Sequence, residues 1–148
     1  MQQQTFVIVG AGLTGAKGAE TLRSEGFDGR VVLLGAESER PYERPPLSKE
    51  YLRGEAGREK VYVHEDRFYE ENEIDLRVRT SVAAIDAAAR EAVLDSGDRL
   101  AFDRLLLATG PTPRKLGVPG HDLDVTEAIQ EQIRSGVRTP AGASRETP

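Results

Sequence analysis

The segment that most restricts the fold runs from Thr5 to Ala16 and reads TFVIVGAGLTGA. An apolar run typical of a buried strand ends in the motif G-x-G-x-x-G, and a helical pattern begins at once. In this order of elements, Gly10 permits a tight turn, Gly12 lets the backbone approach a pyrophosphate, and Gly15 lets the helix lie close to the strand. The first helical N–H groups would face the anion. The segment predicts a phosphate-binding α/β unit; the alternative is a structural strand-to-helix turn.

A helix is predicted at 13–25, followed by Gly26 at the position of a left-handed C-terminal cap. Apolar, mostly small side chains recur at helical spacing on one face, which suits packing against a sheet; they are Leu13, Ala16, Ala19 and Leu22. A second buried strand is predicted at 30–34.

Glu37 lies 22 residues after Gly15, close to the spacing of an acid that hydrogen-bonds the adenosine ribose of a dinucleotide. Glu39 and Glu43 stand nearby, so a solvated loop carboxylate is the alternative interpretation of Glu37.

Composition excludes several classes of function. The chain has 148 residues, enough for one domain, and a net charge of −5 with scattered basic residues, which argues against nucleic acid and anionic membranes as partners. No apolar stretch approaches membrane-spanning length, and the first strand begins too early to leave room for a signal peptide, so we expect a cytoplasmic protein.

Cysteine is absent, which excludes a disulfide framework, a thiolate metal site and a redox-active dithiol. His64 and His121 stand in unrelated contexts, so no metal site is expected. Any redox chemistry must therefore come from a bound cofactor.

The rest of the chain completes the predicted sheet. A proline-rich loop at 41–49 leads into a short helix with Ser48 as N-cap and Gly54 at its end. A polar helix near 65–72 and a strand at 74–78 follow, and 81–102 read as an antiparallel meander. A buried strand at 105–108 then ends in Thr109-Gly110-Pro111. The predicted fold class is therefore α/β, a Rossmann-like parallel sheet with an inserted antiparallel meander.

Three motifs now make a family recognisable over residues 5–123. They are VIVGAGLTG at 7–15, PYERPPLSK at 41–49 and LLLATG at 105–110. The chain resembles the amino-terminal FAD-binding portion of the FAD-dependent, NAD(P)H-using ferredoxin, rubredoxin and putidaredoxin reductases. The first and third motifs are shared across the wider flavoprotein superfamily, and the second is much more specific to this branch. Glutathione-reductase-like members carry a redox dithiol after this loop, and this chain has no cysteine.

The resemblance implies a set of FAD-binding residues. The glycine loop would hold the pyrophosphate, Glu37 the adenosine ribose, and Lys49 would reach the flavin ring. Arg44 would lie near the phosphates and adenine, Val82 would flank the adenine through its backbone, and the segment 108–110 would close the pocket. The cofactor-binding residues expected on this basis are Gly10, Gly12, Leu13, Thr14, Gly15, Glu37, Arg44, Lys49, Val82, Ala108, Thr109 and Gly110. None is expected to act as an acid–base catalyst, because the flavin carries hydride and electrons.

After residue 123 the chain departs from the pattern. A short helix is predicted at 125–134 and a disordered tail at 137–148, in place of the NAD(P)H-binding domain of such reductases. We therefore expect an FAD-binding domain at 1–123, incomplete relative to the family and truncated before the NAD(P)H site. By family the reaction would pass electrons from NAD(P)H through FAD to a ferredoxin or rubredoxin. The alternatives are a stand-alone module for an adenine dinucleotide without redox turnover and an inactive, marginally folded fragment.

Overall fold

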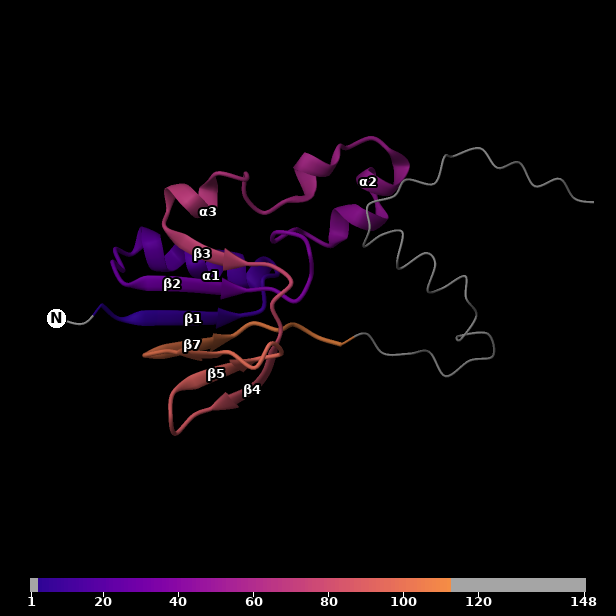
Figure 1. Ribbon diagram of the computed structural model, residues 1–148. Helices are drawn as coiled ribbons and strands as arrows, with labels where there is room; N and C mark the ends of the chain where they lie inside the picture. Colours follow the sequence, from indigo (N-terminus) through magenta and orange to yellow (C-terminus); the bar gives the residue numbers. More distant parts are fainter. Residues whose placement is uncertain (1–2, 113–148) are drawn as a thin grey trace, which may run out of the picture.

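A four-stranded parallel sheet in the order β3-β2-β1-β7 forms the centre of the molecule (Figure 1). The computed structural model describes residues 3–112. The strands are β1 (Thr5–Val9), β2 (Arg30–Leu34), β3 (Ile74–Arg77) and β7 (Arg104–Leu107). Runs of apolar residues in β1 and β2 are buried on both faces, as expected for central strands of a parallel sheet.

One face of this sheet is covered by helix α1 (Leu13–Ser24) and the short helix α3 (Phe68–Glu71). The buried side chains on this face come from alternate positions of the strands, together with one small residue of α1 and one tyrosine of α3; they are Ile8, Ala19, Val31, Leu33, Tyr69 and Ile74. The small side chains of α1 allow the helix to lie close to the sheet.

The other face is covered by a three-stranded antiparallel sheet of β4 (Val82–Asp86), β5 (Glu91–Leu94) and β6 (Arg99–Ala101). Its apolar side chains pack against the second set of alternate strand positions, in a cluster of Val7, Val9, Val32, Leu34 and Leu94. The predicted antiparallel meander is therefore present, and it forms the second layer of the fold.

The connection from β2 to β3 consists of short turns of helix. They are η1 (Pro45–Ser48), α2 (Glu50–Arg53) and η2 (Arg58–Val61), followed by α3. Its two ends are joined by an antiparallel bridge between Tyr42 and Tyr62. The Glu43 N–H donates to the Val61 carbonyl at 2.7 Å and the Val63 N–H donates to the Pro41 carbonyl at 3.0 Å. This bridge fixes the backbone at the start of the PYERPPLSK segment.

Several local predictions were wrong, either in the bounds of an element or in the role of a residue. Leu13, placed on the buried helix face by its spacing, is 45% exposed, because the first residue of α1 projects beyond the end of the sheet. Ser48 is not an N-cap; it closes η1, and α2 follows Lys49 without a side-chain cap. The helix expected near 65–72 spans only α3, and the strand expected at 105–108 lies one residue earlier.

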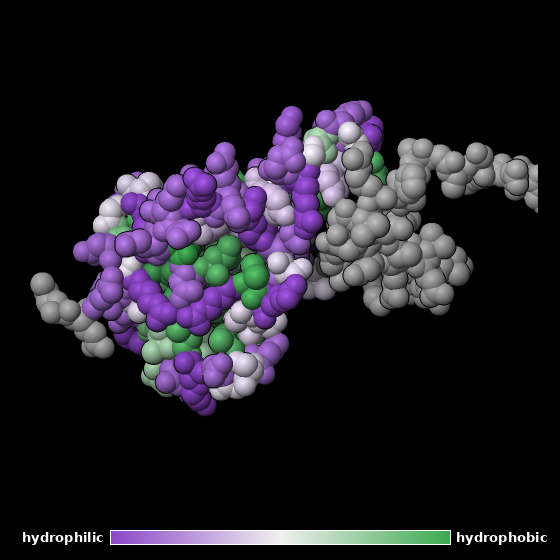
Figure 2. All heavy atoms as spheres, turned by 45° about the horizontal axis from the view of Figure 1, so that its top comes forward, coloured by the Kyte–Doolittle hydropathy of each residue, from purple (hydrophilic) through white to green (hydrophobic). Residues whose placement is uncertain are grey.

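Other local predictions hold. Gly26 has the left-handed φ of +80° expected of a C-terminal cap, and Gly54 ends α2 with a φ of +75°. The predicted helix at 125–134, the tail at 137–148 and His121 lie outside the described residues. Most of the surface in Figure 2 is hydrophilic, with apolar side chains gathered near the middle of that face.

Candidate nucleotide-binding site

A pocket of about 510 Å³ lies at the carboxyl ends of β1, β2 and β7. Its lining comes from the glycine loop, the loop after β2, the start of β4 and the residues that follow β7. Open α/β sheets bind their ligands at this edge, and the volume lies within the range of small-molecule and cofactor sites.

The glycine loop owes its shape to two positions that accept no side chain. Gly10 has a φ of +112°, and a Cβ there would collide with the carbonyl of Ala108. A Cβ on Gly15 would collide with the carbonyl of Gly10 and lie 3.1 Å from the Leu33 side chain. The turn from β1 into α1 and the close approach of α1 to the sheet therefore both depend on glycine.

Gly12 differs from these two positions, because a Cβ built there meets nothing within 4 Å. It is the N-cap of α1, with no side chain capping the first turn and no acidic residue in it. The N–H groups of that turn have no partners within the helix and carry the positive end of its dipole. An open backbone beside these donors suits a phosphate group.

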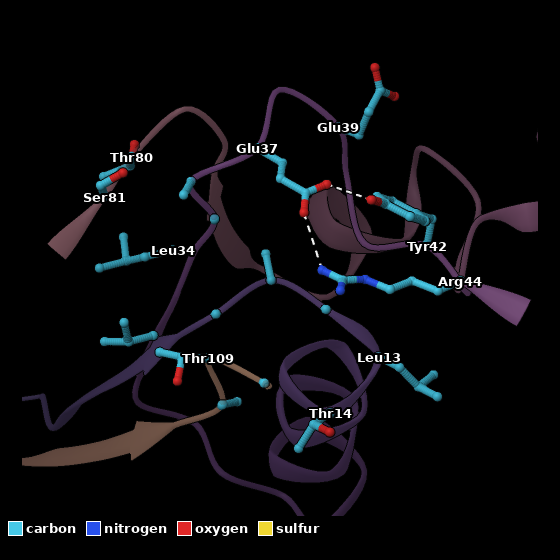
Figure 3. Close-up of a pocket in the computed structure, with 18 of the residues that line it drawn as sticks. Leu13, Thr14, Leu34, Glu37, Glu39, Tyr42, Arg44, Thr80, Ser81 and Thr109 are labelled. Carbon is cyan, nitrogen blue, oxygen red and sulfur yellow. Dashed lines mark hydrogen bonds and ion pairs between the residues drawn. The ribbon is translucent and has the colours of Figure 1, made fainter. Parts of the chain in front are cut away.

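The carboxylate of Glu37 is held by two side chains of the PYERPPLSK segment (Figure 3). The Tyr42 hydroxyl donates to Oε2 at 2.5 Å, and Arg44 Nη2 donates to Oε1 at 3.3 Å. Burial and the adjacent Glu37 carboxylate raise the pKa of Tyr42 to about 12, so this hydroxyl stays protonated at neutral pH. Both oxygens of the Glu37 carboxylate therefore have a hydrogen-bond partner in the pocket wall, while the side chain stays 42% exposed.

Glu39, two residues further on, makes a similar set of contacts. The Tyr62 hydroxyl donates to its Oε2 at 2.7 Å, and Arg58 pairs with its Oε1 at 2.5 Å. These partners, the tyrosine first, lower the pKa of Glu39. In Figure 3 the Glu39 carboxylate points away from Glu37 and the glycine loop.

All the site residues predicted from the sequence line this pocket except Gly15 and Lys49. Gly15 instead allows α1 to pack closely against the glycine loop and the sheet. Lys49 is exposed between η1 and α2, and its expected contact with a flavin ring stays a prediction.

Among the polar side chains that line the pocket, sequence reasoning assigned no binding role to Glu39, Tyr42, Thr80 and Ser81. Tyr42 lies in the PYERPPLSK motif, five residues after Glu37, and this position is the sequence signal for its role. Thr80 and Ser81 directly precede β4 and carried no signal of their own.

Within residues 3–112, no group of three or more His, Asp or Glu side chains is arranged to hold a metal ion. Within the same residues, no helix has the length and apolar character needed to cross a membrane.

Comparison with known proteins gives concordant results. The family described as pyridine nucleotide-disulphide oxidoreductase matches residues 4–144. The ferredoxin–NAD(+) reductase component of the p-cumate 2,3-dioxygenase system of Pseudomonas putida is 44% identical over 143 residues, which are 94% of this chain and 35% of that protein. Rubredoxin–NAD(+) reductase of Pseudomonas putida is 38% identical over 118 residues, 80% of this chain and 31% of its own length.

Among solved structures, the covalent putidaredoxin reductase–putidaredoxin complex matches with a TM-score of 0.77 and 40% identity. The match covers 80% of this chain and 28% of that one. The chain thus spans about a third of the length of these relatives. The fold predicted from the motifs is confirmed, and the chain belongs to the pyridine nucleotide-disulphide oxidoreductase family.

Proposed function

We propose that the pocket binds FAD through its adenosine diphosphate half. The observation that carries the proposal is that one pocket contains both the open N-terminus of α1, at Gly12, and the hydrogen-bonded carboxylate of Glu37. The first offers N–H donors to a pyrophosphate and the second offers acceptors to ribose hydroxyls.

The other lining residues fit the same ligand. Thr109 and Gly110 would close the pocket beside the pyrophosphate, and the backbone of Val82 would flank the adenine. Arg44 contacts Glu37 through one guanidinium nitrogen. Its positive charge would also attract the phosphates of the ligand. Bound FAD would supply the redox chemistry, accepting a hydride from NAD(P)H and passing on electrons.

We further propose that the protein works as a reductase in the cytoplasm, passing electrons from NAD(P)H to a ferredoxin- or rubredoxin-type acceptor. The support is the names of its relatives, a ferredoxin–NAD(+) reductase component, a rubredoxin–NAD(+) reductase and a putidaredoxin reductase. These 148 residues contain one G-x-G-x-x-G motif, and it lines the pocket assigned to FAD. We therefore assign the NAD(P)H site to sequence that these residues do not include.

A second candidate function is binding of an adenine nucleotide without redox turnover by these 148 residues. One observation favours it: Lys49, the cation expected at the flavin ring, is not among the residues that line the pocket. In that case the adenosine diphosphate half would be recognised and the flavin half would lack its site.

The test is to titrate the 148-residue chain with FAD, followed by flavin fluorescence, and with ADP, followed by calorimetry. We expect both to bind at one site and to compete with each other. Binding of ADP without FAD would favour the second candidate, and binding of neither would contradict both. Addition of NADH to the FAD-loaded chain should leave the visible flavin band unbleached; rapid bleaching would show that the NAD(P)H site lies within these residues.

A further inference from the structure

The hydrogen bond from Tyr42 to Glu37 suggests a role for a residue outside the glycine loop. Glu37 stands in an open loop with its side chain 42% exposed. An unrestrained glutamate in such a place samples many rotamers, and fixing one of them on binding costs conformational entropy. A carboxylate that is already fixed binds its ligand without that cost.

Tyr42 is better placed than Arg44 to fix this carboxylate. Its hydroxyl lies 2.5 Å from Oε2, whereas the Arg44 contact is 3.3 Å long and its side chain is 65% exposed. Exposed ion pairs contribute little, and hydrogen bonds to a charged group contribute more. The backbone of Tyr42 is itself anchored by its bridge to Tyr62.

The contacts leave acceptor capacity on both carboxylate oxygens. A carboxylate offers about four lone-pair sites, two on each oxygen. Tyr42 occupies one on Oε2 and Arg44 one on Oε1. One site on each oxygen therefore remains, which matches the two neighbouring hydroxyls of a ribose.

We propose that Tyr42 is a positioning residue that orients the Glu37 carboxylate to receive both hydroxyls of the adenosine ribose. The inference rests on the proposed function, because it concerns the same pocket. It assigns Tyr42 no contact with the ligand: its hydroxyl acts through Glu37.

The test measures ADP affinity by calorimetry for the wild type and for Tyr42→Phe, which removes one hydroxyl group and keeps the ring. We expect Tyr42→Phe to bind ADP about tenfold more weakly, because the ligand must then fix a Glu37 carboxylate that the tyrosine no longer holds. The matched control is Tyr62→Phe, which removes the equivalent hydroxyl from Glu39, whose carboxylate points away from the glycine loop. That variant should keep the wild-type affinity within about twofold.

Two further measurements separate positioning from a general structural effect. In the Glu37→Gln background, Tyr42→Phe should cause little additional loss, because the group through which it acts has changed. With 2′-deoxy-ADP, which lacks one of the two hydroxyls, the wild type and Tyr42→Phe should differ less than with ADP.

Unchanged ADP affinity in Tyr42→Phe, with the wild type binding, would overturn this proposal and leave the proposed function standing. The same conclusion follows if Tyr42→Phe loses the same factor in the Glu37→Gln background or toward 2′-deoxy-ADP. A wild-type chain that binds neither ADP nor FAD would instead contradict the proposed function, and this inference with it.

Discussion

Gly12 and Gly15 belong to the same motif, but Gly12 faces open space and Gly15 is closely packed. Replacement by alanine should therefore affect ligand binding at Gly12 and stability at Gly15. A Cβ on Gly15 meets the Gly10 carbonyl, and relief would require α1 to move away from the sheet. A Cβ on Gly12 meets nothing, at φ −90° and ψ −167°, which any residue adopts. Gly15 is therefore a packing position, and Gly12 keeps the backbone open for a ligand.

We predict that Gly15→Ala lowers the free energy of unfolding by about 2–3 kcal/mol or more, the cost of forcing atoms into a packed contact. Gly12→Ala should lower it by at most about 1 kcal/mol, the cost of a poorer N-cap, while weakening ADP binding at least about tenfold. Urea denaturation and calorimetry of both variants measure the two effects. Equal destabilisation by both substitutions would contradict this division of roles.

Among the elements, Arg23 connects three segments that meet at the amino-terminal edge of the sheet. From α1 its guanidinium donates to the carbonyls of Phe27 at 2.7 Å and Gly29 at 2.8 Å, in the loop to β2. It also donates to Asn72 at 2.7 Å and Glu73 at 2.8 Å, in the turn before β3. One side chain thus donates to backbone carbonyls of two loops.

We predict that Arg23→Ala lowers the free energy of unfolding by about 2–4 kcal/mol, because several carbonyls lose their donor together. Arg23→Lys should recover only part of the loss, since an ammonium group lacks the planar fork of donors. The control is Arg99→Ala, which removes the exposed pair with Glu91 and should cost much less than Arg23→Ala. Similar losses for Arg23→Ala and Arg99→Ala in urea denaturation would refute the prediction.

The elements that the sequence predicted well are those with a periodic pattern. The apolar runs of β1 and β2 and the small-residue face of α1 indicated a parallel sheet with a closely packed helix, and the structure has both. The segment 45–71 could not be predicted in detail, because its short turns depend on contacts with distant residues, such as the bridge from Tyr42 to Tyr62.

The same reason explains what was missed in the candidate site. The spacing from the glycine loop predicted Glu37 as a site residue. Which side chains surround its carboxylate depends on the conformation of the loop after β2, and spacing does not reveal that conformation. Tyr42 and Arg44 approach the carboxylate from a segment whose path is set by the bridge and by hydrogen bonds to Val61 and Val63.

For the whole molecule, we expect stability to depend on pH in two separate ranges, each set by different ionisable groups. Arg77, and then Arg30, lower the pKa of Asp75, and the Tyr62 hydroxyl lowers that of Glu39. A carboxyl with a lowered pKa contributes stability above its ordinary value, and the contribution is lost as the pH falls through the folded-state pKa. For Asp75 and Glu39 this range lies below the ordinary values of 3.8 and 4.5.

His64 belongs to a higher range. Its ring stacks on Phe68 with centroids 3.8 Å apart, and its Nε2 lies 3.3 Å from Glu20 Oε2 without forming a hydrogen bond. Burial lowers the pKa of His64 below its ordinary value of 6.5, although the charge of Glu20 opposes this. The folded state therefore favours the neutral ring, and the stability this provides is complete above pH 6.5 and lost as the pH falls toward the folded-state pKa.

We predict that the wild type loses stability between about pH 7 and pH 5, before the carboxyl groups titrate. His64→Phe, which keeps an aromatic ring against Phe68, should flatten this part of the curve and leave the loss at lower pH unchanged. The measurement is the free energy of unfolding in urea at a series of pH values for both proteins. Parallel curves for the two proteins in this range would contradict a lowered pKa of His64 in the folded state.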